Sequence, residues 1–191
     1  MAPCPGRPGH QNMRKALLFL GILDDSDISW MASEGKKQDI PPGTVLIHEG
    51  QSIESLFIVI DGRLAVSTRA TGTKEIAHLM SGEIVGEMSF VDSRPPSASV
   101  RAIDTSSVLS IPKQVLARRL ATDLAFAGRF YRALAVFLSD RLRTTVGLLG
   151  YAANQPLQDR EYAEEIDPDV LDNVAVAAAR FDWLQRKLRA M

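Results

Sequence analysis

Cysteine is almost absent from this sequence of 191 residues, which contains a single one, Cys4. A disulfide, an iron–sulfur cluster or a zinc site with several thiolate ligands is therefore excluded within one chain. Long apolar runs are lacking too, and none approaches the roughly 18 to 20 residues that a membrane-spanning helix needs. The sequence also opens without a hydrophobic signal segment. These absences predict a cytoplasmic protein without a membrane span.

An excess of charge of either sign is also missing. The chain has 22 Lys and Arg against 23 Asp and Glu, and its formal net charge is −1. Nothing in this balance draws the whole molecule to nucleic acid or to an anionic membrane. Catalytic signatures are equally scarce, because we find no nucleophile motif and no phosphate-binding loop. His48 and His78 stand isolated, without neighbours at metal-ligand spacing. We expect a protein that is not an enzyme, with no catalytic residues and no metal site.

The beginning of the chain is rich in proline and glycine and has no apolar periodicity. We interpret residues 1–12 as a disordered head. A short apolar helix is expected from residue 13, and Gly21 closes it. A second helix is expected to begin in the acidic capping residues near Asp24 and to end at Gly35.

The next part of the chain consists of short apolar runs separated by turns that contain glycine. Asp61-Gly62, between the runs LFIVI and RLAVS, is the best hairpin signal in the sequence. Strands spaced by roughly 8 to 12 residues, with no long helix between them, indicate an antiparallel sandwich or barrel. The expected strands are 44–47, 56–60, 64–68, 75–80, 97–103 and 107–111.

After Pro112 the apolar spacing becomes helical, which predicts a short helix over 113–121 and a long one over 124–149. The long helix carries two adjacent apolar stripes, where a helix lying on a core needs only one. We expect one stripe to pack on the barrel and the other to pair with a partner helix in a homodimer. One stripe comprises Leu120, Leu124, Ala127, Tyr131, Leu134, Leu138, Thr145 and Leu148, interrupted at Arg141, and the other Phe126, Phe130, Phe137 and Leu142.

The last part of the chain reads as an acidic linker, 151–166, and an amphipathic helix, 167–191. Asp167 is the expected N-cap, and Pro168 the first helical residue. Val170, Val174, Ala177, Phe181, Leu184 and Leu188 form the apolar face of this helix. Two interpretations stay open, because this face can dock on its own domain or be offered to another protein. In the second case a protein partner contacts residues 167–190.

The segment SGEIVGEMSFVDSRPPSASVRA, residues 81–102, carries the chemistry. Free N–H groups at the start of a helical turn can hold an anion, and Gly86 lets a ligand approach the backbone. Glu87 is an acceptor suited to a sugar hydroxyl. Ser97 and Ala98 can offer small side chains and N–H groups to a phosphate. We call this segment the cassette.

These motifs, in this order, resemble the cyclic-nucleotide-binding domain family. The resemblance covers roughly residues 17–149 and includes PPGTVLIHEG, the hairpin LFIVIDGRLAVS, the cassette and the two-part helix after it. It implies a mainly β fold with flanking α-helices, an antiparallel double-stranded β-helix or jelly roll known as a β-roll. N-terminal helices, a long helix behind the roll and a tail helix complete the expected architecture. Residues 13–150 would form this domain.

The resemblance also implies a ligand site. Glu87 matches the glutamate that binds the ribose 2′-hydroxyl, and Gly86 keeps the glycine before it. Ser97 and Ala98 match the small residues beside the cyclic phosphate. Thr145 matches a position on the long helix that contacts the purine in some members. Met88, next to Glu87, completes the expected site in the cassette.

The arginine that normally pairs with the cyclic phosphate is missing, because Pro96 occupies its place. Proline can donate neither a side-chain nor a backbone hydrogen bond there. Losing charge-assisted bonds worth about 1.5–3 kcal/mol each could weaken binding on the order of 10- to 1000-fold. Our hypothesis is that Arg94, two residues upstream, replaces the absent arginine. The alternative is that Arg94 is a solvated loop residue.

Two functions remain after DNA binding is set aside. Transcription factors with this ligand domain continue into a winged helix-turn-helix, whereas the segment after Gly150 shows no recognition helix. The first function is a sensor that binds cAMP, another cyclic nucleotide or a similar anionic ligand and signals through its helices to a partner. The second is a ligand-independent dimeric docking or assembly protein with a degenerate pocket. Pro96 favours the second function. Glu87, which has no obvious structural need to be there, favours the first.

Overall fold

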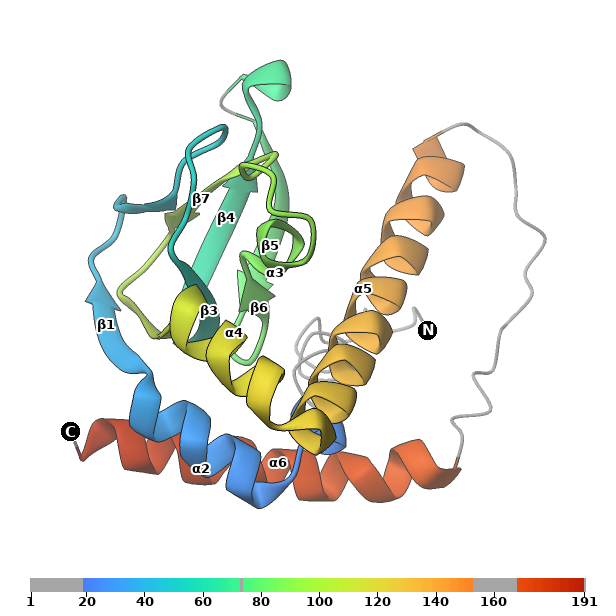
Figure 1. Ribbon diagram of the computed structural model, residues 1–191. Coiled ribbons are helices and arrows are strands. Elements are labelled where there is room, and N and C mark those ends of the chain that lie inside the picture. Colours follow the sequence, from blue (N-terminus) through green and yellow to red (C-terminus); the bar gives the residue numbers. More distant parts are fainter. Residues whose placement is uncertain (1–18, 73, 153–167, 191) are drawn as a thin grey trace, which may run out of the picture.

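The computed structural model describes residues 19–72, 74–152 and 168–190, and the following elements lie within these ranges (Figure 1). Residues 19–22 are helical, and α2 (Asp25–Glu34) follows and ends before Gly35 as expected. The expected disordered head lies outside the described residues. So does the expected acidic linker, except for its first two residues, which belong to the preceding helix.

The strands of the described chain form two antiparallel sheets, ordered β1-β8-β3-β6 and β2-β7-β4-β5. The chain crosses repeatedly from one sheet to the other, as in a jelly roll, so the expected β-roll with flanking helices is confirmed. The bounds are β1 (Lys36–Ile40), β2 (Val45–Ile47), β3 (Ser55–Asp61), β4 (Arg63–Ser67), β5 (Glu75–Met80), β6 (Ile84–Val85), β7 (Ser99–Ala102) and β8 (Ser106–Pro112). A short 3₁₀ turn, η1 (Arg69–Thr71), lies between β4 and β5.

Two of these strands were not expected from the sequence. The first, β1, has the sequence KKQDI and only its last residue is buried, so it shows no apolar alternation. It forms a strand because it pairs with β8 at the edge of the sheet. The other, β6, has only two residues, which is too short to give a periodic pattern.

The hairpin between β3 and β4 turns at Gly62, as the Asp61-Gly62 pair predicts. Gly62 has a φ of 90°, in the left-handed region that favours glycine. A Cβ atom there would also lie only 2.6 Å from the Cα of Ser106. The turn therefore needs glycine for its backbone conformation and for the close approach of the neighbouring chain.

Strand β3 separates two hydrophobic cores. Phe57 and Val59 point into the roll, where they join buried residues of both sheets such as Leu64. Ile58 and Ile60 point the other way and pack against the helices. Burial on both faces explains why β3 reads as an uninterrupted apolar run, LFIVI, instead of an alternating one.

The helices after the roll are α4 (Lys113–Thr122) and α5 (Leu124–Ala152), in good agreement with the expected ranges. Asp123 separates them, and its carboxylate accepts a hydrogen bond from the N–H of Phe126, which caps the start of α5. In Figure 1, α5 diverges from the roll toward its C-terminal end.

The two apolar stripes of α5 divide between core and surface, although not residue by residue as predicted. Phe126, Phe130 and Phe137 are buried against the helical face of β3, and Leu134 joins them from the other stripe. Three other stripe residues are exposed: Leu124 (82%), Tyr131 (51%) and Leu142 (64%). The buried set holds α5 on its own domain, and the exposed set has no cover within the described chain.

The C-terminal helix α6 (Pro168–Arg189) packs on its own domain, beside α2 (Figure 1). Ala177, Leu184 and Leu188, from its predicted apolar face, are buried in the helical core. The guanidinium of Arg180 donates hydrogen bonds to the carbonyls of Leu20 (3.1 Å) and Gly21 (3.2 Å) and contacts the carboxylate of Asp25.

This packing decides between the two interpretations of the apolar face. It docks in cis, so the face itself is not available to a partner. The side-chain amide of Gln185 adds a hydrogen bond of 2.7 Å to the carbonyl of Ile60, at the end of β3. Helix α6 thereby joins the N-terminal helices to the roll.

A buried carboxylate, Asp27, connects α2 to both helices behind the roll. Its oxygens accept hydrogen bonds from Arg129 of α5 at 2.7 and 3.1 Å and from Arg119 of α4 at 3.0 Å. The N–H of Asp24 donates a further bond to it at 3.0 Å. The guanidinium of Arg119 also stacks on the rings of Trp30 and Phe126.

These contacts set the charge of Asp27. Burial by itself raises the pKa of its carboxyl group. The hydrogen bonds from Arg129 and Asp24 and the charges of Arg129 and Arg119 outweigh burial and hold the pKa below its ordinary value. Asp27 is therefore ionised at neutral pH.

Replacing this carboxylate should destabilise the protein in a manner that depends on pH. We expect Asp27→Asn to lower the free energy of unfolding at pH 7 by about 3 kcal/mol. Two partly buried arginines lose their buried counterion and keep only the more exposed carboxylates of Asp24 and Asp123. The folded-state pKa lies below the unfolded value of about 3.9, so this stabilisation is complete above that pH. It disappears as the pH falls through the folded-state pKa, and the two proteins should then converge. Urea unfolding midpoints between pH 7 and pH 3 measure the difference.

Asp39→Asn provides the control, because the side chain of Asp39 is 71% exposed and lies 3.7 Å from Lys37. An exposed pair of this kind contributes little, at most about 1 kcal/mol. Equal unfolding midpoints for Asp27→Asn and Asp39→Asn at pH 7 would contradict the role assigned to Asp27.

Candidate functional site

The cassette begins where β6 passes into the short helix α3 (Glu87–Val91). Gly86 lies between them with a φ of 88°. A Cβ atom at this position would come within 2.6 Å of Ile53 and 3.3 Å of the carbonyl of Ser55. Gly86 is thus required by the backbone conformation and by the packing of the loop before β3. The same sharp turn places Glu87 at the start of α3, directed inward.

The carboxylate of Glu87 is buried and forms an ion pair with the guanidinium of Arg141 on α5. The side chain of Glu87 is 4% exposed, and that of Arg141 is 29% exposed. Arg141 also lies over the ring of Phe137, with 5.6 Å to the ring centroid. Glu87 therefore does have a structural partner, contrary to our expectation, and the pair connects the cassette to the long helix.

Arg141 is the site residue that sequence reasoning missed. The available signal was the interruption of an apolar stripe by a charged residue in the middle of a long helix. A charge at such a position needs a partner when the helix packs on a core. The sequence alone did not show that this partner would be Glu87, 54 residues away.

The expected phosphate-binding end of the cassette is more open. Ser97 is exposed, and Ala98 is half-buried against the core of the roll. The carbonyl of Pro96 accepts a hydrogen bond of 2.8 Å from the N–H of Gly50, which holds the cassette against the loop after β2. Pro96 therefore has a structural role through its backbone carbonyl.

Arg94, the expected substitute for the arginine missing at Pro96, lies in the exposed loop after α3. Its side chain is 84% exposed and faces the carboxylate of Asp92 at 3.9 Å. The N–H of Arg94 also donates to Asp92, so the loop is locally closed on itself. The structure places the cation that accompanies Glu87 on α5 instead, at Arg141.

The two other expected site residues lie at the edge of this arrangement. Met88 is 54% exposed at the start of α3. Thr145 is exposed on α5, one helical turn after Arg141, and its hydroxyl donates to the carbonyl of Arg141 at 2.9 Å. Arg141 and Thr145 thus lie on the same side of α5.

The chemistry available here is recognition. A buried carboxylate accepts hydrogen bonds from hydroxyl groups, and a neighbouring guanidinium donates to an anion. Within the described residues, no group of three or more histidine, cysteine or acidic side chains could hold a metal ion. The arrangement fits a small anionic ligand that carries hydroxyl groups.

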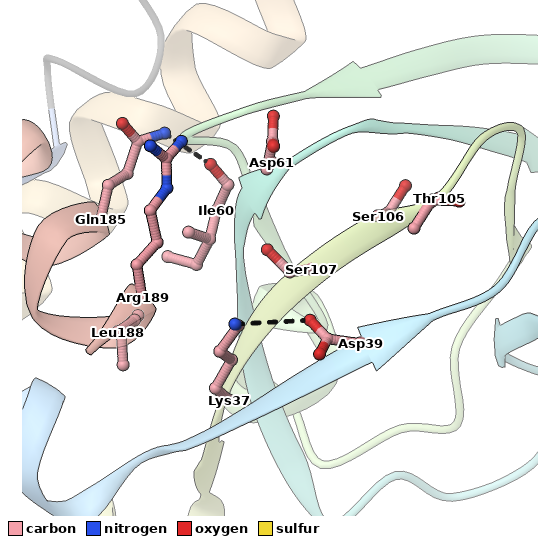
Figure 2. Close-up of a pocket in the computed structure, with 10 residues that line it drawn as sticks. All are labelled: Lys37, Asp39, Ile60, Asp61, Thr105, Ser106, Ser107, Gln185, Leu188 and Arg189. Atoms are coloured by element: carbon pink, nitrogen blue, oxygen red, sulfur yellow. Dashed lines mark hydrogen bonds and ion pairs between the residues drawn. The ribbon is translucent and has the colours of Figure 1, made fainter. Parts of the chain in front are cut away.

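A separate cavity of about 190 Å³ lies between α6 and the adjacent strands β1, β8 and β3 (Figure 2). Gln185 closes one side through its bond to Ile60, and the pair Lys37–Asp39 lies on another. No cassette residue lines it, so this cavity is not part of the candidate site.

Comparison with known proteins gives a consistent result. Residues 37–123 match the cyclic nucleotide-binding domain family. The whole chain is 24% identical over 192 aligned residues to the HTH-type transcriptional regulator Cmr of Mycobacterium tuberculosis, of which it covers 70%. It is 26% identical over 135 residues to the CRP-like cAMP-activated global transcriptional regulator of the same species. That match takes in 70% of this chain and 58% of the relative.

Solved structures share the fold. A cyclic nucleotide-binding domain from Methylobacillus flagellatus superposes with a TM-score of 0.66 at 20% identity, covering 76% of this chain and 86% of that one. The catabolite activator protein of Thermus thermophilus gives a TM-score of 0.59 at 24% identity, covering 72% and 63%. Among the described residues, no helix is long and apolar enough to cross a membrane.

The ion pair between Glu87 and Arg141 should be measurable as an energetic coupling. We expect Glu87→Gln and Arg141→Gln each to lower the free energy of unfolding, because each leaves a partly buried charge without its partner. The double variant should lose less than the sum, with a coupling of about 1–3 kcal/mol. Urea unfolding of the four proteins measures it.

Arg63 and Asp104 form the matched control. Their side chains are 55% and 41% exposed and lie 2.7 Å apart. Water screens this pair, so the same cycle should give a clearly smaller coupling. Additive effects of Glu87→Gln and Arg141→Gln would show that the pair does not hold α5 to the cassette.

Proposed function

Because residues 37–123 belong to the cyclic nucleotide-binding domain family, we propose that this protein is a cytoplasmic, non-enzymatic regulatory module that binds a cyclic nucleotide or a similar anionic ligand. The observation that carries the proposal is the buried carboxylate of Glu87, set at the start of α3 by the left-handed turn of Gly86. A buried hydrogen-bond acceptor that faces α5 is suited to a ligand that contacts both the cassette and this helix.

Each part of a cyclic nucleotide has a candidate partner. Glu87 is proposed to accept from the ribose hydroxyl, and the N–H groups and small side chains of Ser97 and Ala98 to face the phosphate. Arg141 is the proposed donor to the anionic part of the ligand, since it lies beside Glu87, whereas Arg94 is solvated. Thr145, one turn along α5, is the proposed contact to the base.

A ligand that touches both the cassette and α5 can transmit a signal only through its different affinities for two arrangements of the helix. The ion pair Glu87–Arg141 defines one arrangement. A ligand that donates a hydrogen bond to Glu87 and accepts one from Arg141 defines the other. We propose that this exchange is the signalling step.

The second candidate function is a dimeric docking or assembly protein without a ligand. Two observations favour it. Pro96 removes the arginine of the cassette, and Glu87 is paired with Arg141 of its own chain. Under this alternative the pair is a permanent structural contact.

Calorimetric titration with cyclic mononucleotides distinguishes the two functions. We expect saturable binding of cAMP or cGMP, weakened about 10- to 1000-fold by Glu87→Ala or Arg141→Ala through lost charge-assisted hydrogen bonds. Arg94→Ala should bind as the wild type does. Absence of heat and of any thermal shift at millimolar ligand would instead support the docking function.

We further propose that the protein is a homodimer through α5. The exposed residues Leu124, Tyr131 and Leu142 are separated by seven and eleven positions, close to two and three helical turns, which places them on one stripe of the helix. Gly128 and Ala135 lie on the same stripe and are exposed. Their small size permits close approach of a second helix. Covering this stripe with its copy removes large apolar side chains from water.

A charge on the stripe should separate the subunits. Leu142→Glu is expected to shift the protein from dimer to monomer, because pairing would bury a carboxylate at the interface. Sedimentation equilibrium at several protein concentrations measures the change. Arg143→Glu, at the neighbouring exposed position off the stripe, should leave the dimer intact. A wild-type protein that is monomeric at all concentrations would overturn the proposal.

Among the residues whose side chains the structure describes, the outer side of α6 offers a surface to the protein partner expected at residues 167–190. The inner face of α6 is occupied in cis, whereas Val176 (43%) and Trp183 (37%) are exposed on its outer side. Lys187 lies over the ring of Trp183 at 4.9 Å and adds a charge there. We propose that the signal reaches a partner through this outer face.

A further inference from the structure

A groove of about 390 Å³ lies on the side of the cassette where α3 meets the beginning of α4. Its lining comes from the loop before β3, from α3 and the loop after it, and from the first turns of α4. Neither Glu87 nor Arg141 lines it. The groove is therefore separate from the candidate ligand site, although both use the cassette.

Two cationic side chains, Lys113 and Arg94, line this groove. The ammonium of Lys113 donates a hydrogen bond of 3.0 Å to the carbonyl of Ser89, which fixes its position. An ammonium has three donors, so two remain for a ligand. Arg94 lies in the loop after α3, and its side chain is 84% exposed.

Lys113 is partly removed from water. Burial lowers the pKa of its ammonium, while the negative charges of Glu54 and Asp92 act in the opposite direction. A partly desolvated ammonium gains more from an anionic ligand than a fully hydrated one does. Its place in the first turn of α4 adds the positive end of the helix dipole on the same side.

The rest of the lining suits an organic group attached to the anion. Ile53, Phe90 and Ala117 give apolar contacts, and the carboxylate of Glu54 can accept from a hydroxyl or an amine. The volume lies in the range of small-molecule sites, about 300–1000 Å³. Inorganic phosphate alone would leave most of it empty.

We propose that this groove is a second ligand site, for a phosphomonoester of about the size of a nucleoside monophosphate. Lys113 and Arg94 bind the phosphate, and the apolar wall with Glu54 holds the organic part. The site assigns a role to Arg94 that does not involve the candidate ligand site at Glu87.

A ligand in this groove would contact α3 and α4, the two elements connected to Glu87 and to the helix of Arg141. Ser89 and Phe90 belong to α3, which begins with Glu87, and α4 leads directly into α5, which carries Arg141. A phosphomonoester bound to both therefore favours one relative position of α3 and α4. The groove is in a position to influence the pocket without contacting its ligand.

Titration of the full-length protein with AMP, followed by calorimetry, tests the proposal. We expect saturable binding that inorganic phosphate competes with and that adenosine, which has no phosphate, does not reproduce. Lys113→Gln should weaken AMP about 10- to 100-fold, because it removes a charge-assisted contact. Arg94→Gln should weaken it about two- to fivefold, as an exposed charge does.

Arg118→Gln is the matched control, since Arg118 is exposed on α4 and does not line the groove. It should bind AMP as the wild type does. Thermal melting without ligand shows whether Lys113→Gln is folded, and Arg94→Gln keeps the test decisive if it is not.

Three results would overturn the site. These are no saturable binding of AMP at millimolar concentration, adenosine binding as well as AMP, or unchanged AMP affinity in both variants. The last result would place AMP elsewhere on the protein. None of them bears on cyclic nucleotide binding beside Glu87, which the titrations with cAMP and cGMP examine separately.

Discussion

The arrangement of the helices depends on one buried carboxylate, Asp27. It lies on α2 and receives hydrogen bonds from Arg119 of α4 and Arg129 of α5, so three helices meet at a single charged group. Asp123, at the junction of α4 and α5, contacts Arg119 as well, at 3.5 Å. A charge with no exposed surface is tolerated only while its partners stay in place. The direction in which α5 leaves the roll is therefore set at its base, far along the helix from Arg141.

The sequence pattern predicted an antiparallel sandwich or barrel followed by helices, because the signals for these elements are local. The Asp61-Gly62 turn, the buried run LFIVI and the change to helical spacing after Pro112 each depend on neighbouring residues. Strand β1 was missed because it is extended only through its pairing with β8, about 70 residues away. The packing of α6 in cis was left open for the same reason. Its apolar face shows that the helix needs cover, and only the fold shows that the N-terminal helices and the end of β3 supply it.

In the candidate site, too, the contacts between residues distant in the sequence could not be predicted. Gly86 and Glu87 were found because they form a recognisable pair in the sequence, and their positions at the start of α3 agree with that prediction. Their structural roles were not predicted. Ile53 packs where a Cβ atom on residue 86 would lie, so this position requires glycine. Glu87 is the ion-pair partner of Arg141. Both contacts join residues far apart in the chain. No spacing rule connects them, so the pairing of cassette and helix emerges only from the folded chain.

The ion pair between Glu87 and Arg141 determines which contacts a ligand of the proposed site has to replace. With Pro96 in the cassette, the positive charge beside the acceptor belongs to α5 and not to the loop that turns around the phosphate. A ligand cannot fill a vacant site here, because Glu87 is nearly fully buried and already paired. It must offer both residues at least the interactions that they give each other, since a buried charge left without a partner is costly. The free energy of binding is then the difference between the contacts of the ligand with Glu87 and Arg141 and the contact of these two residues with each other. Both sets of contacts include Arg141 of α5. Under the proposed function, ligand binding and movement of α5 are therefore the same event, which is the condition under which a ligand can act as a signal.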